Sequence, residues 1–219
     1  MIKIAEVVEE LVRKSPFLIE SLNEGLINVS ALARKLQPDV EAMLGRPIKS
    51  GAIVMAVNRM PAGKLTYEQH ALQSFFRKLS DLNVRTDLID YTFRNSDTLP
   101  TRQARLLRDI EDKPNLFYSV SRGVTETTIL VTSSLEEQVE SIFREEKLQA
   151  KETQLSAITL LLPTENRSLY GVYYYILKDL AWRGINLIEL ISTSNEFTII
   201  VRNEDLDQAF SAVAGLRGN

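Results

Sequence analysis

The 219-residue chain contains no cysteine and a single histidine, His70. Without cysteine the chain forms no disulfide, carries no thiol nucleophile and lacks the usual ligands of a structural zinc site. The residues around His70, TYEQHALQ, are typical of a surface helix and supply no second imidazole. We therefore expect neither a metal nor a cofactor.

Long apolar runs are also missing. No stretch approaches the roughly 20 apolar residues that a membrane-spanning helix needs. The amino-terminal MIKIAEVVEELVRK is amphipathic and acidic in its middle, unlike a signal peptide. The nine glycines are scattered, so no glycine-rich phosphate loop is present. No nucleophile, base and orienting group stand together, and we expect a cytoplasmic, non-enzymatic protein without membrane contact.

The first 81 residues predict an all-helical domain. Apolar residues near the amino terminus recur with the i, i+3, i+4, i+7 spacing of an amphipathic helix. Ser15-Pro16 and Asn28 each begin a further helix. Pro38 is expected to break the helix that follows Asn28, because proline lacks the backbone donor.

From about residue 84 the apolar period changes from 3.6 to two, which indicates strands. Further strands are expected at 116–121, 127–132, 155–162, 187–191 and 197–201, and helices at 101–110, 135–144, 169–182 and 205–216. Trp182, near the end of one of these helices, is expected in the core.

A sequence repeat underlies this order. ETTILV at residues 126–131 matches EFTIIV at residues 196–201, and each copy is followed by a polar turn and a helix. Two β-α-β-β-α copies with antiparallel strands and helices on one face form a ferredoxin-like pair. The sequence therefore predicts an α+β fold: a helical domain over 1–81, then two ferredoxin-like βαββαβ units over 82–150 and 151–219.

The second unit resembles the carboxy-terminal ACT domain of aspartokinases over roughly residues 155–216. The resemblance rests on Gly171-Val172 opening a helix, Gly184-Ile185-Asn186 after it, and ELISTS at residues 189–194. Residues 84–150 resemble a degenerate partner ACT unit, whose strand–helix loop RNSDTLPTRQ has no glycine. The lysine-phenylalanine-glycine-glycine opening of the kinase is absent, so the resemblance implies a tandem ACT regulatory region without the kinase.

The resemblance further implies an amino-acid effector, bound at an interface between paired ACT units, and hence a homodimer. Backbone amides at the start of the Gly171 helix would favour the effector carboxylate. Carboxylate and amide side chains would take the ammonium, and short hydroxyls would supply further hydrogen bonds. The residues implied in binding are Glu165, Asn166, Gly171, Val172, Glu189, Ser192, Thr193 and Ser194. The alternative is that Gly171 serves packing and that Ser-Thr-Ser is only a turn.

The pattern of residues 27–64 is typical of a helix-turn-helix, with VSALARKL as the supporting helix and GAIVMAVNRM as the recognition helix. Residues 34–64 contain six Lys/Arg against two Asp/Glu, a bias that suits nucleic acid. The candidate DNA contacts are Arg34, Lys35, Lys49, Ser50, Asn58 and Arg59. The alternative is a helical packing domain, because residues 52–57 are all apolar.

These patterns favour a non-catalytic regulatory protein that binds an amino acid through paired ACT domains. Two alternatives remain: an amino-acid-responsive, DNA-binding transcription regulator, and a dimerisation or partner module with no ligand.

Overall fold

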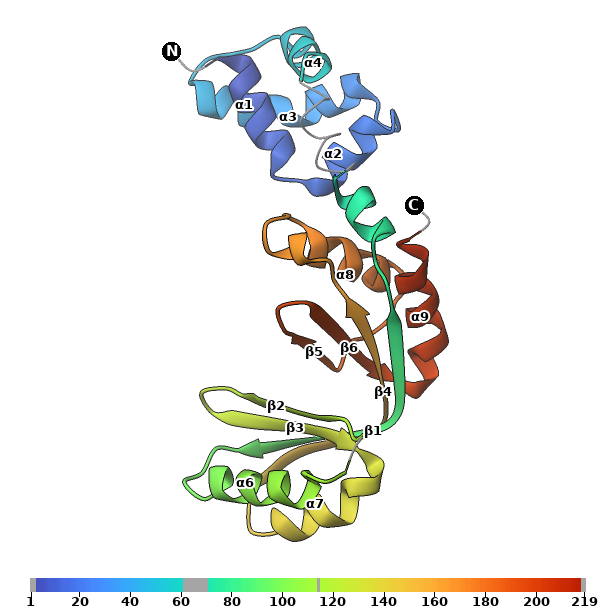
Figure 1. Ribbon diagram of the computed structural model, residues 1–219. Helices are drawn as coiled ribbons and strands as arrows, with labels where there is room; N and C mark the ends of the chain where they lie inside the picture. Colours follow the sequence, from blue (N-terminus) through green and yellow to red (C-terminus); the bar gives the residue numbers. More distant parts are fainter. Residues whose placement is uncertain (1–2, 61–70, 114, 218–219) are drawn as a thin grey trace. The chain divides into compact units, whose positions relative to one another are not determined.

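A computed structural model describes residues 3–60, 71–113 and 115–217 (Figure 1). The chain divides into two compact units, Met1–Ala71 and Leu72–Asn219. Residues 71–77 are helical, whereas His70 lies outside the described residues.

The described part of the first unit is built from α1 (Ile4–Arg13), α2 (Pro16–Asn23), α3 (Val29–Leu44) and α4 (Ser50–Asn58). The buried positions within the helices follow the helical period of the sequence, and Ile48 between α3 and α4 joins them. The core contains Val7, Val8, Val12, Leu32, Ala33, Leu36, Val40, Ile48, Ile53, Ala56 and Val57. The Asn28 cap is confirmed, because its side-chain oxygen accepts a hydrogen bond from the Ala31 amide at 3.1 Å.

The expected break at Pro38 is wrong, because α3 continues through this residue to Leu44. Leu36 and Val40, on either side of the proline, are both buried in the same core. Their burial offsets the backbone hydrogen bond that proline cannot donate. The segment PDVEAML is therefore the second half of α3 rather than a separate short helix.

The second unit contains one six-stranded antiparallel sheet with the strand order β2-β3-β1-β4-β6-β5. The predicted mixture of helices and antiparallel strands is confirmed. The strands are β1 (Leu82–Arg94), β2 (Tyr118–Arg122), β3 (Glu126–Thr132), β4 (Leu148–Leu161), β5 (Glu189–Ser192) and β6 (Glu196–Arg202). The α-helices are α6 (Leu99–Ile110), α7 (Glu136–Ile142), α8 (Val172–Trp182) and α9 (Leu206–Gly215), and short 3-10 turns include η2 (Thr164–Arg167).

The long strands β1 and β4 run through the whole sheet and divide it into two halves. Asp87 in β1 and Gln154 in β4 both have positive φ, 58° and 57°, and the pairing register shifts beside Asp87. Such irregularities bend strands. The first half has the order β2-β3-β1-β4 and the second β1-β4-β6-β5, so each half uses parts of both long strands (Figure 1).

Helices cover one face of each half. One cluster joins the β1–β3 side chains to α6 and α7, and it includes Tyr91, Phe93 and Leu106. A second joins β4 and β6 to α8, α9 and the helix at 71–77, and it includes Phe76 and Ile158. The opposite, helix-free face carries a third cluster to which both halves contribute: Leu88, Leu130, Leu155, Ala157 and Ile200. The two halves therefore pack on each other through this face.

Candidate functional site

The residues predicted to bind a ligand fall into two groups, on opposite faces of the sheet. The first group surrounds the amino terminus of α8. Gly171 precedes this helix with φ +84°, and no side chain caps the helix there. A Cβ at Gly171 would lie 3.6 Å from Leu72 Cδ1, an ordinary contact, so the positive φ is what requires glycine. Val172 is only 3% exposed and belongs to the core.

The Ser-Thr-Ser segment closes the β5–β6 hairpin beside α8. The Thr193 amide donates to the Glu196 carbonyl at 2.9 Å, and the Glu196 amide donates to Thr193 Oγ1 at 3.2 Å. Ser192 Oγ lies 2.9 Å from the Tyr173 hydroxyl, whose ring stacks on Phe197. The hydroxyls of Ser192 and Thr193 are thus already engaged in hydrogen bonds that hold the turn.

Asn166 and Glu165 lie on η2, next to this turn. The Asn166 side-chain amide donates to the Ser194 carbonyl at 2.9 Å, while its Oδ1 is buried without a hydrogen-bond partner among the described residues. Glu165 forms an exposed ion pair with Lys78 at 3.0 Å. A hydrogen bond from its own backbone amide, and then Lys78, lower the pKa of Glu165. Glu165 therefore has a cationic partner within the protein.

Glu189 lies on the other face. In the β5–β6 register it is opposite Ile200, and cross-strand partners point to the same face of a sheet. Ile200 belongs to the helix-free cluster. The structure therefore separates Glu189 from Gly171 and Ser192, with which the sequence groups it.

On the helix-free face, Glu189 meets Asp90 of β1, from the other half of the sheet. The two carboxyl groups interact, and each shifts the pKa of the other. Asp90 is only 6% exposed and also accepts a 3.4 Å hydrogen bond from Thr92 Oγ1. Asp90 alternates with Ile89 and Tyr91, which belong to the helix-covered core, and the packing of the second half against the opposite face buries Asp90.

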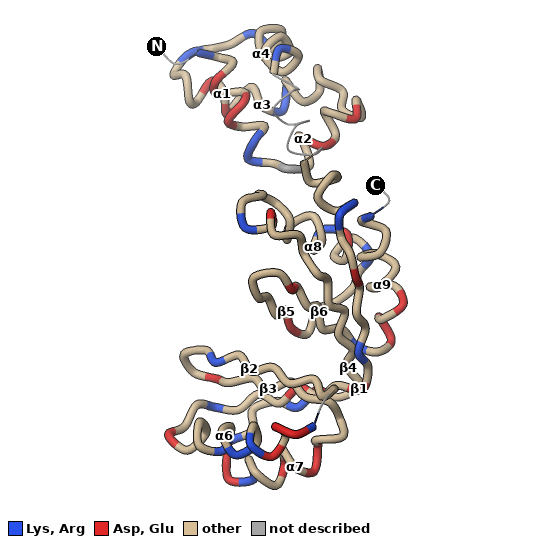
Figure 2. Tube along the Cα trace, in the orientation of Figure 1, with Lys and Arg blue, Asp and Glu red and all other residues tan. Residues whose placement is uncertain are grey.

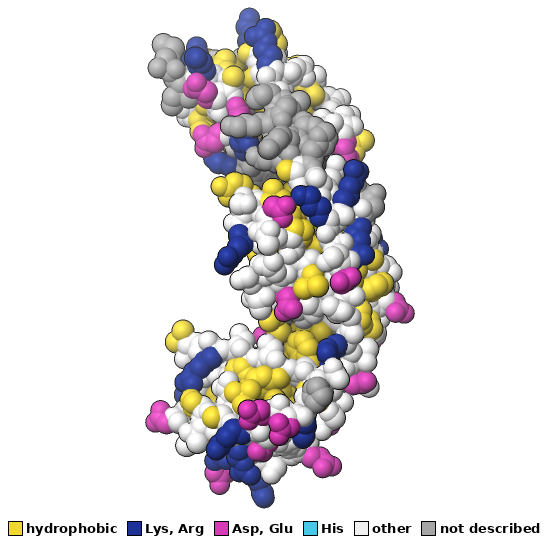
Figure 3. Space-filling model, in the orientation of Figure 1, with side chains coloured by type: hydrophobic (Ala, Val, Ile, Leu, Met, Phe, Trp, Pro, Cys, Tyr) yellow, Lys and Arg dark blue, Asp and Glu magenta, His cyan; other side chains and the backbone are white. Residues whose placement is uncertain are grey.

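The pair lines a cavity of about 490 Å³ to which both halves contribute. The other residues with polar side chains in its wall are Thr92, Thr128, Glu152, Asn186 and Arg202. Arg202 lies 3.3 Å from Glu152. In the space-filling view the surface is hollowed between the β2–β3 and β5–β6 hairpins (Figure 3). The cavity wall thus carries three carboxyl groups and one guanidinium.

Both carboxyl groups have raised pKa values. Burial, and then the hydrogen bond and charge of Asp90, raise the pKa of Glu189 to about 7. Burial is also the largest cause of the raised pKa of Asp90. Two ionised carboxylates side by side repel each other, and a proton or an external cation relieves this repulsion. Among the described residues, no group of three His, Asp or Glu side chains could hold a metal ion.

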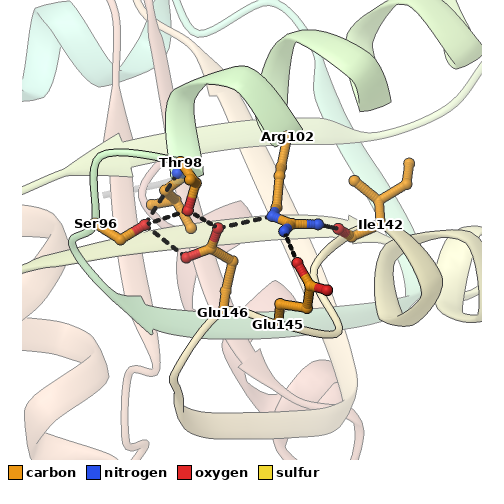
Figure 4. Close-up of polar contacts among 7 residues, drawn as sticks. Ser96, Thr98, Arg102, Ile142, Glu145 and Glu146 are labelled. Carbon is orange, nitrogen blue, oxygen red and sulfur yellow. Dashed lines mark hydrogen bonds and ion pairs between the residues drawn. The ribbon is translucent and has the colours of Figure 1, made fainter.

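The corresponding strand–helix loop of the first half is filled by the protein's own side chains (Figure 4). Glu146 accepts hydrogen bonds from Ser96 Oγ at 2.6 Å, Thr98 Oγ1 at 2.7 Å and Arg102 Nε at 2.8 Å. Ser96 Oγ in turn accepts from the Leu99 amide at the start of α6. Burial acts to raise the pKa of Glu146, but these hydrogen bonds outweigh it and lower the pKa. A carboxylate therefore already lies at this end of α6.

The predicted DNA contacts lie on α3 and on α4 with its two flanking residues, Lys49 and Arg59. Five are exposed, Arg34, Lys35, Lys49, Asn58 and Arg59, and Ser50 is half-buried. The expectation that α4 is buried on most sides holds only for one face, because Ile53, Ala56 and Val57 are buried while Met55 is 53% exposed. None of the helices within residues 3–60, 71–113 and 115–217 has the length and apolar character of a membrane span.

No protein-family model and no curated protein matches the sequence. Solved structures do match the fold. The regulatory subunit of aspartate kinase from Thermus thermophilus, in its ligand-free form, is 11% identical with a TM-score of 0.51, over 63% of this chain and 97% of that one. A structure of aspartokinase alpha and beta subunits is 14% identical with a TM-score of 0.51, over 64% and 99%. The regulatory subunit from Thermus flavus is 9% identical with a TM-score of 0.50, over 63% and 97%. The resemblance drawn from the sequence is thus confirmed at the level of the fold.

Proposed function

We propose that the chain is a non-catalytic regulatory protein that binds an amino acid through two paired ACT-type halves. The halves correspond to the units at 82–150 and 151–219, which share β1 and β4. The strand orders β2-β3-β1-β4 and β1-β4-β6-β5 support this assignment, because each is the order of a ferredoxin-like unit. The helical domain at 1–81 precedes them.

The observation that carries the proposal is the Asp90–Glu189 pair in the cavity between the halves. An ammonium group has three donors and a positive charge, so it can contact both carboxylates and relieve their repulsion. Neither carboxyl group has a cationic ion-pair partner among the described residues. Arg202 and the hydroxyls of Thr92 and Thr128, in the same wall, are the groups suited to the effector carboxylate.

Binding there has a direct regulatory consequence. Asp90 belongs to the first half and Glu189 to the second, so a ligand that contacts both stabilises one arrangement of the two halves. The free energy available for such a switch is the difference in the ligand's affinity for the two arrangements. Two copies of the chain are proposed to pair through the same sheet-containing unit.

The test is thermal unfolding of the full chain across a panel of amino acids. A ligand at about 100 times its Kd stabilises a fold by roughly 2.7 kcal/mol. For a unit of this size we expect a rise in Tm of roughly 5–10 °C with at least one amino acid. Glu189→Gln and Asp90→Asn should abolish the rise, whereas Gly171→Val, on the opposite face, should retain it.

The other outcomes are equally informative. Loss of the rise in Gly171→Val alone would place the effector at the amino terminus of α8. No rise with any amino acid would favour the dimerisation module without a ligand, and sedimentation analysis would then show a stable dimer indifferent to amino acids.

DNA binding remains the alternative function, and the exposure of the basic side chains of α3 and α4 favours it. It predicts association with duplex DNA that weakens steeply as salt increases. Reversing the charges of Lys49 and Arg59 should then remove the association in a mobility-shift assay. Absence of binding by the unaltered chain at low salt would exclude this alternative.

A further inference from the structure

A second cavity lies in the first half of the sheet-containing unit, between α6 and the end of α7. It has a volume of about 320 Å³. α6 turns Leu99, Leu106 and Ile110 toward the core. The adjacent face of the helix, with residues three or four apart, lines the cavity. The lining residues are Asp97, Thr98, Thr101, Arg102, Arg105, Arg108 and Ile142.

Arg102 forms a fixed wall of this cavity. Its guanidinium donates to Glu146 at 2.8 Å, to the Ile142 carbonyl at 2.8 Å and to Glu145 (Figure 4). These contacts tie α6 to the end of α7 and compensate the charge of Arg102. The position of Arg102 in the cavity wall is therefore fixed by hydrogen bonds to three residues.

Arg105 and Arg108 have no such compensation. Both are exposed, and neither forms an ion pair with any of the described residues. Asp109 and Asp112, four residues further along, form no ion pair with them either. The cavity itself contains a single carboxylate, Asp97. Figure 2 shows the basic positions gathered along α6, and Figure 3 shows Lys and Arg side chains on the surface there.

The excess of positive charge is local, since the whole chain has a net charge of −3. Two guanidinium groups at i and i+3 lie on neighbouring turns and can approach one anion together. The hydroxyl of Thr101 adds a neutral donor in the first turn of α6, where the helix dipole also favours negative charge, whereas the Thr98 hydroxyl already donates to Glu146. Planar guanidinium groups with hydroxyl donors match the tetrahedral oxygens of phosphate.

We propose that this cavity binds a small phosphate-bearing anion, with Arg105 and Arg108 as its principal ligands. The site is separate from the carboxyl-lined cavity, which takes a cation, and it does not depend on the proposed amino-acid binding. Inorganic phosphates and organic phosphate monoesters share the recognised group, and both fit the chemistry of the wall.

The experiment is isothermal titration of the full chain at low salt with pyrophosphate, glycerol 3-phosphate and, as a carboxylate anion, citrate. We expect saturable binding of pyrophosphate, of glycerol 3-phosphate or of both, which distinguishes inorganic from organic phosphate. Arg105→Gln/Arg108→Gln should weaken binding by roughly tenfold or more. The control Arg94→Gln/Arg122→Gln removes the same charge from exposed positions on β1 and β2 and should change the affinity by less than about twofold.

Three results would overturn the proposal. The first is no saturable binding of either phosphate by the unaltered chain. The second is equal weakening by the two double variants, which would show attraction to overall charge only. The third is citrate binding as tight as that of the phosphates. Circular dichroism of both double variants confirms that the helices remain folded.

Discussion

Asp90 on β1 and Glu189 on β5 line one cavity and shift each other's pKa although they belong to different halves of the sheet. The contact lies on the helix-free face, beside the small apolar cluster that both halves form. Burial, and then the neighbouring Asp90, raise the pKa of Glu189 to about 7. This relationship makes the packing of the halves sensitive both to pH and to cations.

The stability of the sheet-containing unit should fall as the pH rises through neutrality. The pKa of Glu189 is about 7 in the folded protein against an ordinary 4.5. The folded state therefore binds more protons, and this stabilisation is full below about 4.5 and is lost as pH rises through about 7. We expect a loss on the order of 2 kcal/mol between about pH 5 and pH 8. Asp90, Glu152 and Arg202 face the same cavity and contribute to the profile.

The measurement is urea unfolding followed by the fluorescence of Trp182, the single tryptophan of the chain, which lies in this unit. Glu189→Gln should flatten the pH dependence, because the amide cannot ionise. Glu196→Gln changes an exposed carboxyl group on the neighbouring strand and should leave the slope unchanged. If the unfolding free energy of all three proteins changed equally with pH, the raised pKa of Glu189 would be refuted.

Glu146→Gln should destabilise the same unit by about 2 kcal/mol at neutral pH. The buried carboxylate accepts three hydrogen bonds, and its side chain is 3% exposed. Because its pKa is lowered by these bonds, the difference from the unaltered chain should shrink as acid protonates the carboxylate. Glu145→Gln, at a carboxylate that is 79% exposed, is the matched control and should cost less than about 1 kcal/mol.

Leu155→Ala should cost about 2–5 kcal/mol of unfolding free energy, because Leu155 is fully buried in the cluster between the halves. Leu148→Ala on the same strand is the control, since Leu148 is 46% exposed. Its cost should stay below about 1 kcal/mol. Similar costs for the two variants, measured by Trp182 fluorescence in urea, would mean that the halves do not pack through this face.

Asn28→Ala should destabilise the first unit by about 0.5–2 kcal/mol, because the Ala31 amide loses its side-chain acceptor at the start of α3. Amide hydrogen exchange in α3 measures the effect without interference from the second unit. Asn23→Ala, at the end of α2, is the comparison, and the Ala31 amide should exchange at the unaltered rate there. Unchanged exchange in Asn28→Ala would show that the cap contributes nothing.

The sequence by itself determined the elements whose signals are local. The cap at Asn28, the alternating pattern of β1 and the ETTILV–EFTIIV repeat each depend on residues close together in the chain, so the helices and antiparallel strands could be predicted. The fold resemblance followed from the same stretches. The spacing of apolar side chains and the hydrogen bonds of helix caps depend on residues only a few positions apart, so both can be predicted without a structure.

Only the tertiary structure decided which distant residues meet. It carried α3 through Pro38, because burial on both sides of the proline outweighs one lost hydrogen bond. It left Trp182 72% exposed at the end of α8, where the sequence indicated core. In the folded protein Glu189 lies on the face of the sheet opposite Gly171, where it lines a cavity with Asp90. The two carboxyl groups come together because the strands bend at Asp87 and Gln154 and one half packs against the other. Such contacts depend on how whole elements pack, and no spacing within either strand encodes them.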